Sequence, residues 1–231
     1  MAGSAQLRVS KTKDIPNPNY YVKALGSEFA SWAYDEEKAP SFKGKWRSEV
    51  FAVDEDAFLD LEIGTGNGYH FAHRAETQPE RCLLGIELKY KPLIQSVRRA
   101  VNAECKNMRG MRYNARLISN LFAPGELDDV FIHFPDPWEK KRQRKHRLIQ
   151  PDYMKLLFEM QRPGSTIEFK TDSRSYFDWA IEVFESCPYT LDRTSFDLHQ
   201  SEYAAENFIT HFERLFLRQG LPIHYARLIR S

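Results

Sequence analysis

Cysteine is scarce in this chain of 231 residues, and the few cysteines present argue against two kinds of site. Cys82, Cys105 and Cys187 are an odd number, lie far apart and form no CxxC pair, and no histidine stands close to them as a partner ligand. Neither a disulfide framework nor a zinc site is therefore indicated. The sequence predicts a protein of the reducing cytoplasm that holds no metal.

A long apolar run is also missing. No unbroken apolar stretch approaches the length of a membrane span. The N-terminal segment MAGSAQLRVSKTKD lacks the apolar core of a signal peptide. No membrane partner is expected.

The chain has almost no excess of either charge, since 33 lysines and arginines face 32 aspartates and glutamates. The charges are nevertheless unevenly distributed, because residues 140–147 contain six cations and no acid, and residues 98–116 are also basic. Acids concentrate at 28–37, 54–56 and 192–206. One side of the folded molecule should therefore be positive, which favours phosphate binding over a merely solvated, flexible face.

From about Ala57 onward, short β-rich apolar runs alternate with helical patterns. This alternation is typical of a doubly wound α/β fold, with helices on both faces of a mostly parallel sheet, and we expect a final antiparallel strand at the C-terminus. The predicted strands are 57–63, 81–87, 128–134, 166–171, 190–196 and 223–229. A further strand, together with its exit, is predicted within 108–115, between the second and fourth strands. The predicted helices are one that ends at Glu76, then 91–103, 174–186 and 202–219. Residues 1–41 are expected to form an N-terminal arm or cap whose order the sequence leaves open, and residues 42–231 the single domain.

The segment LEIGTGNG (61–68) places three glycines between an apolar strand and a helix. Such a turn lets a ligand approach the backbone closely. A dinucleotide fingerprint would require its third glycine at position 69, which is Tyr69 here, so a nicotinamide oxidoreductase is disfavoured. The spacing of Gly64, Gly66 and Gly68 instead resembles class I S-adenosyl-L-methionine (SAM) methyltransferases.

Two acids accompany this turn. Glu87 ends the second predicted strand, 25 residues after Glu62, where a doubly wound fold places the acid that accepts hydrogen bonds from ribose hydroxyls. Glu62 is predicted to stabilise the cationic end of SAM. The alternatives are a solvent-exposed acid at a strand end for Glu87 and a capping or salt-bridged acid for Glu62.

The most specific feature is HFPDPWEKKRQRKHR, residues 133–147. This segment resembles the bacterial tRNA (guanine-N7)-methyltransferase family, which carries Phe-Pro-Asp-Pro-Trp after the fourth strand and then a basic run. Other segments similar to the family follow in the same order: FKGKWRSEVF (42–51), LEIGTGNG, GIE (85–87), FKTD (169–172), SFDLHQSEY (195–203) and THFE (210–213). The resemblance therefore covers the chain from about Phe42 to the C-terminus.

The resemblance implies an enzyme that transfers a methyl group from SAM to N7 of the variable-loop guanosine, nucleotide 46, of tRNA. It implies Asp136 as the catalytic residue. The implied SAM-binding residues are Glu62, Gly64, Gly66, Gly68, Glu87, Asn114, Ala115 and Asp136. The implied substrate-binding residues are Lys140, Asp172, Thr210, His211, Phe212 and Glu213, and the implied RNA-binding residues are Arg142, Gln143, Arg144, Lys145, His146 and Arg147. The family usually has Asp-Ala where this chain has Asn114-Ala115, so adenine recognition should differ in detail.

The chemistry is consistent with this hypothesis. Guanine N7 already carries a lone pair, so catalysis requires orientation and stabilisation of the cationic product rather than a general base. Asp136, held between two prolines, suits this task, although a simple turn-forming aspartate is the alternative. Trp138 either stacks on a base or plugs the core, Asp172 and Glu213 either contact substrate or form ion pairs, and His133 is expected to be a core or supporting histidine.

Three rival functions remain open: a SAM enzyme acting on another RNA, one acting on a small molecule, and a non-catalytic RNA-binding module. An enzyme that acts on a small molecule is disfavoured because it has no need of the basic run 140–147. A module that only binds RNA is disfavoured because the residues expected for the cofactor site and for catalysis are all present: Glu62, Gly64, Gly66, Gly68, Glu87 and Asp136. The protein itself is expected to be a monomer or a homodimer.

Overall fold

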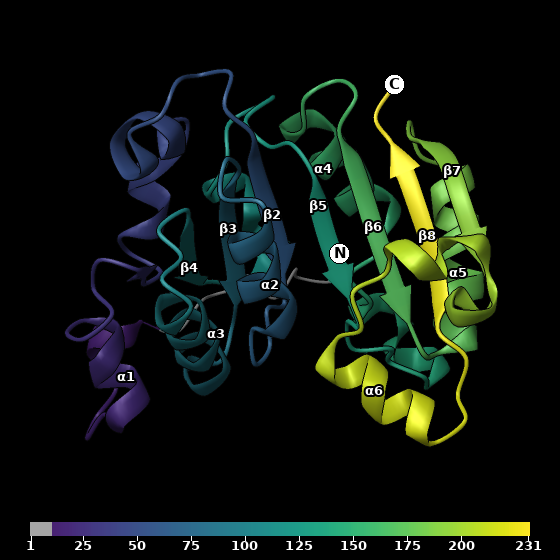
Figure 1. Cartoon of the computed structure of the whole chain (residues 1–231), viewed down its shortest axis with the longest axis horizontal. Coiled ribbons are helices and arrows are strands. Elements are labelled where there is room, and N and C mark those ends of the chain that lie inside the picture. Colours follow the sequence, from purple (N-terminus) through teal and green to yellow (C-terminus); the bar gives the residue numbers. More distant parts are fainter. Residues whose placement is uncertain (1–10) are drawn as a thin grey trace, which may run out of the picture.

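The computed structural model describes residues 11–231, which build an eight-stranded sheet in the order β1-β4-β3-β2-β5-β6-β8-β7 (Figure 1). The strands are β1 (Ala33–Tyr34), β2 (Leu59–Ile63), β3 (Cys82–Glu87), β4 (Met108–Arg112), β5 (Val130–His133), β6 (Thr166–Thr171), β7 (Thr190–Ser195) and β8 (His224–Ile229). Among these strands, β8 is inserted antiparallel between β6 and β7, and the remaining pairs are parallel. The predicted mostly parallel sheet with a C-terminal antiparallel strand is confirmed.

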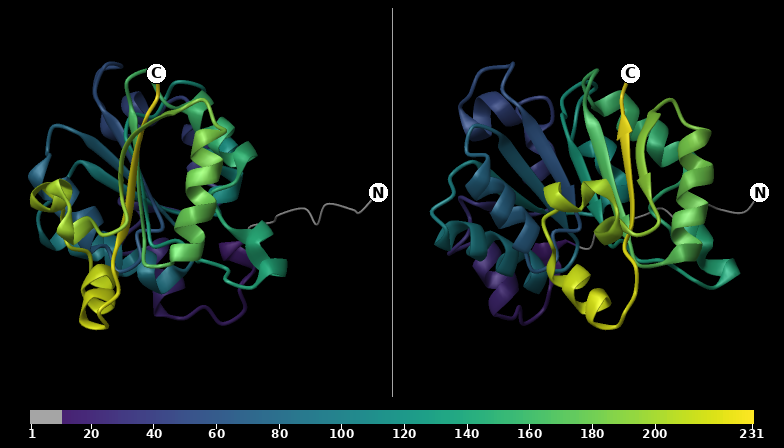
Figure 2. Two further views of the ribbon diagram at one scale, coloured as in Figure 1. Left: turned by 90° about the vertical axis from the view of Figure 1, so that its right-hand side faces the viewer. Right: turned by 45° about the vertical axis from the view of Figure 1, so that its right-hand side comes forward.

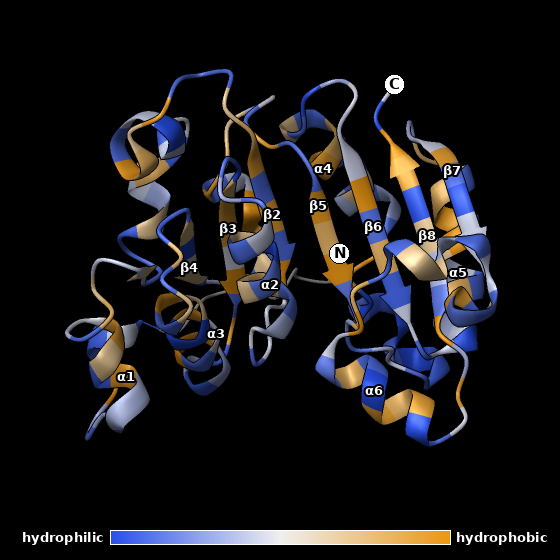
Figure 3. Ribbon diagram, viewed as in Figure 1, coloured by the Kyte–Doolittle hydropathy of each residue, from blue (hydrophilic) through white to orange (hydrophobic). Residues whose placement is uncertain are grey.

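Helices cover both faces of this sheet, as the two side views show (Figure 2). Helices α2 (Tyr69–Thr77) and α3 (Tyr90–Asn102) pack on one face, and α4 (Pro151–Met160) and α5 (Arg174–Glu185) pack on the other. Strands β3 and β5 are hydrophobic along much of their length (Figure 3), as expected for central strands buried between two helical layers. Because β2 to β6 pair in parallel, their carboxyl ends lie at the same edge of the sheet.

Strand β2 shows how the sequence assigns side chains to the two faces. Alternate residues point to opposite sides of a strand, so Leu59 and Leu61 join the larger apolar core, while Asp60 and Glu62 lie on the face covered by α2. The Asp60 carboxylate accepts hydrogen bonds from Arg74 and Arg81, which compensates its burial. Glu62 is held beside the first turn of α2 by His70, whose Nδ1 lies 2.7 Å from its carboxylate.

The N-terminal segment packs against the rest of the fold from residue 12 onward. Helix α1 (Tyr20–Leu25) contributes Val22 and Leu25 to buried positions, and β1 extends the sheet by pairing with β4. Trp46 is fully buried, and its indole N–H donates to the Leu121 carbonyl oxygen at 2.8 Å. The division of the chain into an arm and a domain at residues 41 and 42 stays a prediction.

One predicted helix is wrong. Instead of a continuous helix over 202–219, the structure has a 3-10 turn, η7 (Glu202–Glu206), and a separate helix, α6 (His211–Arg218). Thr210 has an extended backbone (ψ 170°), and its side chain and that of Glu213 form a reciprocal capping box that begins the new helix. No helix within residues 11–231 combines the length and the apolar composition that crossing a membrane requires.

Candidate active site

The glycine turn after β2 forms the floor of a small cavity at the carboxyl edge of the sheet. Gly64 and Gly68 have φ values of 82° and 76°, a conformation that side chains rarely adopt. At Gly68 a Cβ would lie 2.3 Å from the Cα of Ser96, so glycine also allows α3 to pack closely. At Gly64 the space above the backbone is open to 4 Å, which leaves room for a ligand.

Predicted site residues from three parts of the chain meet around this cavity of about 40 Å³. It is lined by Glu62, the turn 64–68, Tyr69, His70, His133, Phe134, Thr210, His211 and Phe212. The Glu62 carboxylate is buried and lies 2.7 Å from Nδ1 of His70. A buried carboxylate at this position provides a counter-charge for an ammonium or sulfonium group.

Glu87 lies at the end of β3, beside the same turn. One carboxylate oxygen accepts a hydrogen bond from the Gly66 N–H at 3.2 Å, and the other accepts one from the Lys89 N–H at 2.9 Å. These two bonds fix the orientation of the carboxylate and leave each oxygen a free lone pair. The geometry suits an acid that accepts hydrogen bonds from two neighbouring hydroxyls.

A second cavity, of about 290 Å³, lies beyond Glu87 along the same edge. It is lined by Leu88, Asn114, Arg116, Asp136, Trp138, His146 and Leu148. The Asn114 side-chain oxygen accepts a hydrogen bond from the Arg116 N–H at 3.1 Å and caps the 3-10 turn η4, which begins at Ala115. The structure thus brings Asn114 and Asp136 to one cavity, and adds Arg116, the last cation of the basic stretch 98–116, which had been given no role in the site.

The backbone on both sides of Asp136 is strained. Phe134 and Trp138 have φ values of 51° and 45°, which are uncommon for large side chains. The loop is held by the Phe134 N–H, which donates to the Lys170 carbonyl oxygen at 2.8 Å, and by the Pro137 carbonyl oxygen, which accepts from Nε of Arg147 at 2.8 Å. Asp136 is consequently exposed on a fixed loop at the mouth of the larger cavity.

Most of the basic run is accessible, as an RNA-binding surface requires. Lys140, Arg142 and Lys145 are exposed, and residues 141–146 form the 3-10 turn η5. The Trp138 ring lies 5.3 Å from the His146 ring, at the junction of this turn and the larger cavity. The basic surface therefore borders the loop that carries Asp136.

Arg147 is enclosed by the protein, unlike the exposed Lys140, Arg142 and Lys145 of the same run. Its side chain is fully buried, and besides the bond to Pro137 it donates to the Ser175 carbonyl and hydroxyl oxygens, both at 3.0 Å. Its guanidinium also packs over the Tyr176 ring at 4.8 Å. All three nitrogens are thus used inside the protein, where the residue anchors the Asp136 loop, and its contact with RNA stays a prediction.

Glu213, whose contact with substrate stays a prediction, is also enclosed by the protein. The side chain is 0% exposed, and one oxygen accepts hydrogen bonds from His199 and Asn207 at 2.8 and 2.6 Å. The other oxygen accepts from the Thr210 N–H at 3.1 Å and lies 3.7 Å from Nζ of Lys170. With its acceptors occupied, Glu213 fixes the start of α6 and thereby places Thr210 at the small cavity.

Asp172 lies just beyond β6, half-buried, and burial raises the pKa of its carboxyl group. The adjacent Ser173 hydroxyl donates to Glu139, which also accepts from Ser175, each at 2.5 Å. Glu139 lies just after the motif, so these bonds tie it to the end of β6. The substrate role of Asp172 stays a prediction.

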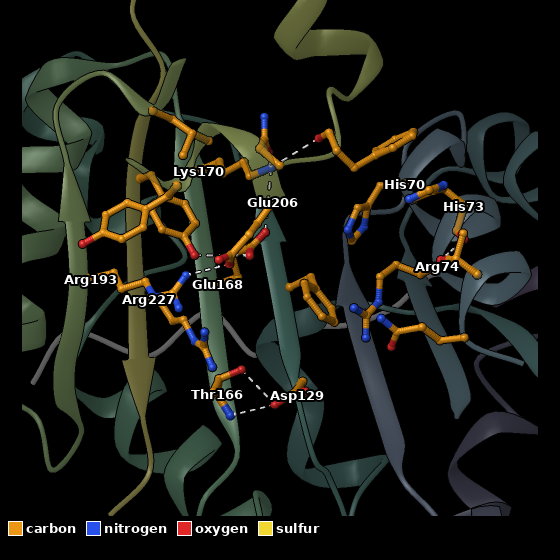
Figure 4. Close-up of a pocket in the computed structure, with 18 residues that line it drawn as sticks. His70, His73, Arg74, Asp129, Thr166, Glu168, Lys170, Arg193, Glu206 and Arg227 are labelled. Carbon is orange, nitrogen blue, oxygen red and sulfur yellow. Dashed lines mark hydrogen bonds and ion pairs between the residues drawn. The ribbon is translucent and has the colours of Figure 1, made fainter. Parts of the chain in front are cut away.

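A polar pocket lies on the sheet face that faces α2, with Glu168 and Lys170 of β6 in its wall (Figure 4), and it shares His70 with the small cavity. Nε2 of His133 lies 2.8 Å from the Glu168 carboxylate, and burial lowers the pKa of His133 to about 3, so this histidine is neutral. Although burial opposes it, the hydrogen bond from His133 and the charge of Lys170 hold the pKa of Glu168 well below its usual range. His133 is therefore a supporting histidine, and the i, i+2 spacing of Glu168 and Lys170 in β6 was the signal that could have revealed its partners.

Solved structures with the same fold are RNA-modifying and other methyltransferases. The 16S rRNA methyltransferase KamB matches with a TM-score of 0.55 at 14% identity, covering 77% of this chain and 91% of that one. A SAM-dependent methyltransferase from Aquifex aeolicus matches with a TM-score of 0.53 at 10% identity, and the match covers 86% of this chain and 100% of that one. The sheet order, the glycine turn and the two strand-end acids together define a class I SAM-dependent methyltransferase.

The sequence comparisons narrow this class. A family model described as a putative methyltransferase matches residues 56–226. The tRNA (guanine-N(7)-)-methyltransferase of Bdellovibrio bacteriovorus is 52% identical over 89% of this chain and 98% of its own length, and that of Bacillus subtilis is 33% identical over 81% and 86%. The chain belongs to the family of tRNA (guanine-N(7)-)-methyltransferases.

Proposed function

We propose that this enzyme transfers the methyl group of SAM to N7 of guanosine 46 in the variable loop of tRNA, and that it does so in the cytoplasm. The observation that carries the proposal is the position of Asp136. It lies on a fixed loop between the two cavities of the cofactor edge and the exposed basic turn 141–146. A base held there would face the cofactor, while its backbone phosphates would face the lysines and arginines.

The residues fit SAM. The buried Glu62 carboxylate suits the cationic methionine end, the open backbone at Gly64 admits close approach, and Glu87 suits the ribose hydroxyls. Asn114 in the larger cavity offers an amide that can read the adenine edge. When bound, SAM supplies an activated methyl group on a sulfonium centre.

The chain's own residues then have two tasks. Asp136 orients guanine by accepting hydrogen bonds from its N1–H and 2-amino edge, which leaves N7 free to face the methyl group. The same carboxylate stabilises the positive charge that develops on the base as N7 is alkylated. No proton needs to leave N7, so the mechanism requires no general base.

The experiment is to incubate the purified protein with labelled SAM and unmodified tRNA and to map the modified base. We expect 7-methylguanosine at nucleotide 46. A matched tRNA that carries 7-deazaguanosine at that position lacks the nucleophilic nitrogen, so methylation there should disappear. Methylation that persists in the deaza tRNA would contradict the N7 assignment, and label recovered only in small molecules would favour a different substrate class.

A further inference from the structure

A second positively charged groove, far in sequence from the basic turn 141–146, opens beside the cofactor cavity. It has a volume of about 600 Å³ and lies between the glycine turn and α3. Its lining is polar and cationic: Asn67, Tyr69, Gln95, Arg98, Arg99, Asn102 and Ala103. Asn67 and Tyr69 line both this groove and the small cavity that holds Glu62, so the two spaces are adjacent.

Arg99 is held in a defined orientation in this groove. Its guanidinium carbon lies 3.7 Å from the centre of the Tyr69 ring, and its Nε donates to the Asn67 carbonyl oxygen at 3.2 Å. The Tyr69 ring in turn stacks on His211 of α6 with a centroid distance of 5.4 Å and an interplanar angle of 13°. Arg99 is therefore preorganised, which reduces the entropy lost when its two terminal nitrogens bind a ligand.

Charge in the groove is only weakly compensated. Within residues 11–231, no carboxylate lies at ion-pair distance from Arg99. Arg98 has one acidic neighbour, Glu28, whose carboxylate lies 3.8 Å away, and its Nη2 also donates to the Tyr20 hydroxyl. The amides of Asn67, Gln95 and Asn102 add neutral donors around the two cations. The two terminal nitrogens of Arg99, with neutral amides nearby, are suited to bind a phosphate group.

We propose that this groove binds a backbone phosphate of the tRNA strand next to the target nucleotide, with Arg99 as its main ligand and Arg98 as a second cation. The proposal rests on the proposed function. The groove and the basic turn 141–146 would then bind the strand on two sides of the cofactor edge, so that the target base is held from both directions. Neither Arg98 nor Arg99 belongs to the motif that precedes the basic turn.

The test compares tRNA binding by wild-type protein, Arg98→Ala/Arg99→Ala and a matched control, Lys155→Ala, which removes an exposed cation from α4. At about 0.1 M salt the double variant should bind tRNA about tenfold more weakly, and the slope of log K against log salt should fall by about 0.7–0.9 for each phosphate that the protein no longer neutralises. Lys155→Ala should keep the wild-type slope. Calorimetry should give a SAM affinity within about twofold of wild type for all variants, which shows that the cofactor site is intact.

Arg99→Lys separates charge from structure, because lysine keeps the cation but cannot reproduce the planar fork. It should restore most of the salt slope while binding tRNA more weakly than wild type. If the double variant binds tRNA with wild-type affinity and slope while wild-type protein forms 7-methylguanosine, the groove proposal is wrong and the proposed function stands. If wild-type protein forms no 7-methylguanosine but the double variant still loses salt-dependent tRNA binding, the groove proposal stands and the proposed function fails.

Discussion

Replacing Arg147 with alanine should separate structural from RNA-binding cations within one basic run. The buried guanidinium makes three hydrogen bonds, of 2.8, 3.0 and 3.0 Å, to Pro137 and Ser175. Hydrogen bonds to a charged group contribute about 1.5–3 kcal/mol each, but the cost of burying the cation offsets part of their sum. We therefore expect Arg147→Ala to lower the free energy of unfolding by roughly 3–5 kcal/mol, since the Pro137 carbonyl oxygen is also left without its donor.

The assay is urea unfolding followed by tryptophan fluorescence, together with the salt dependence of tRNA binding. Arg142→Ala is the matched control, because Arg142 is exposed on the same run. It should change the free energy of unfolding by less than about 0.5 kcal/mol and lower the salt slope by about 0.7–0.9. Arg147→Lys keeps the charge but can replace only part of the three-bond fork, so it should remain destabilised. Unchanged stability of Arg147→Ala combined with a reduced salt slope would refute the structural assignment.

The site residues give four more expected outcomes. Glu87→Ala should weaken SAM binding by roughly 1.5–3 kcal/mol, because it loses charged hydrogen bonds to the ribose; calorimetry that shows unchanged affinity would disprove this role. Asp136→Ala should bind SAM nearly normally yet lose about two or more orders of magnitude in turnover, and a tRNA with inosine at the target should slow wild type more than this variant if Asp136 binds the 2-amino group. Asn114→Asp should be tolerated, since an aspartate oxygen can also accept from the Arg116 N–H; a large loss of SAM affinity would point to a required amide N–H. Burial lowers the pKa of His133 in the folded protein to about 3, so its contribution to the free energy of unfolding is complete above a pH of roughly 6.5 and is lost as the pH falls towards 3. His133→Asn should therefore make the free energy of unfolding less dependent on pH on the acid side. An unchanged pH profile would contradict the assignment of His133 as neutral and buried.

The main strands and the cofactor turn could be predicted because local patterns determine them. The apolar run that contains β2, the glycines after it and Glu87 at the end of β3 all lie where periodicity and spacing place them. The break between η7 and α6 does not show in helical periodicity, and its local signal was the capping-box spacing of Thr210 and Glu213, which begins a new helix. The structure adds Lys170 and His199, which lie beside the Glu213 carboxylate.

The burial of Arg147 could not be predicted from local patterns. Arginine in a basic run looks the same in sequence whether it faces solvent or the interior, and only the packing of Tyr176 and Ser175 from α5 shows that this one is enclosed. Burial of a charged group requires partners that the local sequence does not reveal. The N-terminal elements α1 and β1 were missed because the two-residue strand and the six-residue helix are too short for a periodic signal.

The left-handed backbone at Phe134 and Trp138 has a consequence for how this enzyme can evolve. Each such residue costs about 1–2 kcal/mol relative to a relaxed conformation, and the anchors at Lys170 and Arg147 hold the loop in place against that cost. Glycine would remove that cost at either position, but it would also remove ring contacts, since the Phe134 ring lies 5.5 Å from that of Phe216 and the Trp138 ring 5.3 Å from that of His146. Evolution at these two positions is therefore constrained from both sides: a small residue relaxes the backbone but gives up packing of the loop that carries Asp136, whereas another large side chain keeps the packing and the strain.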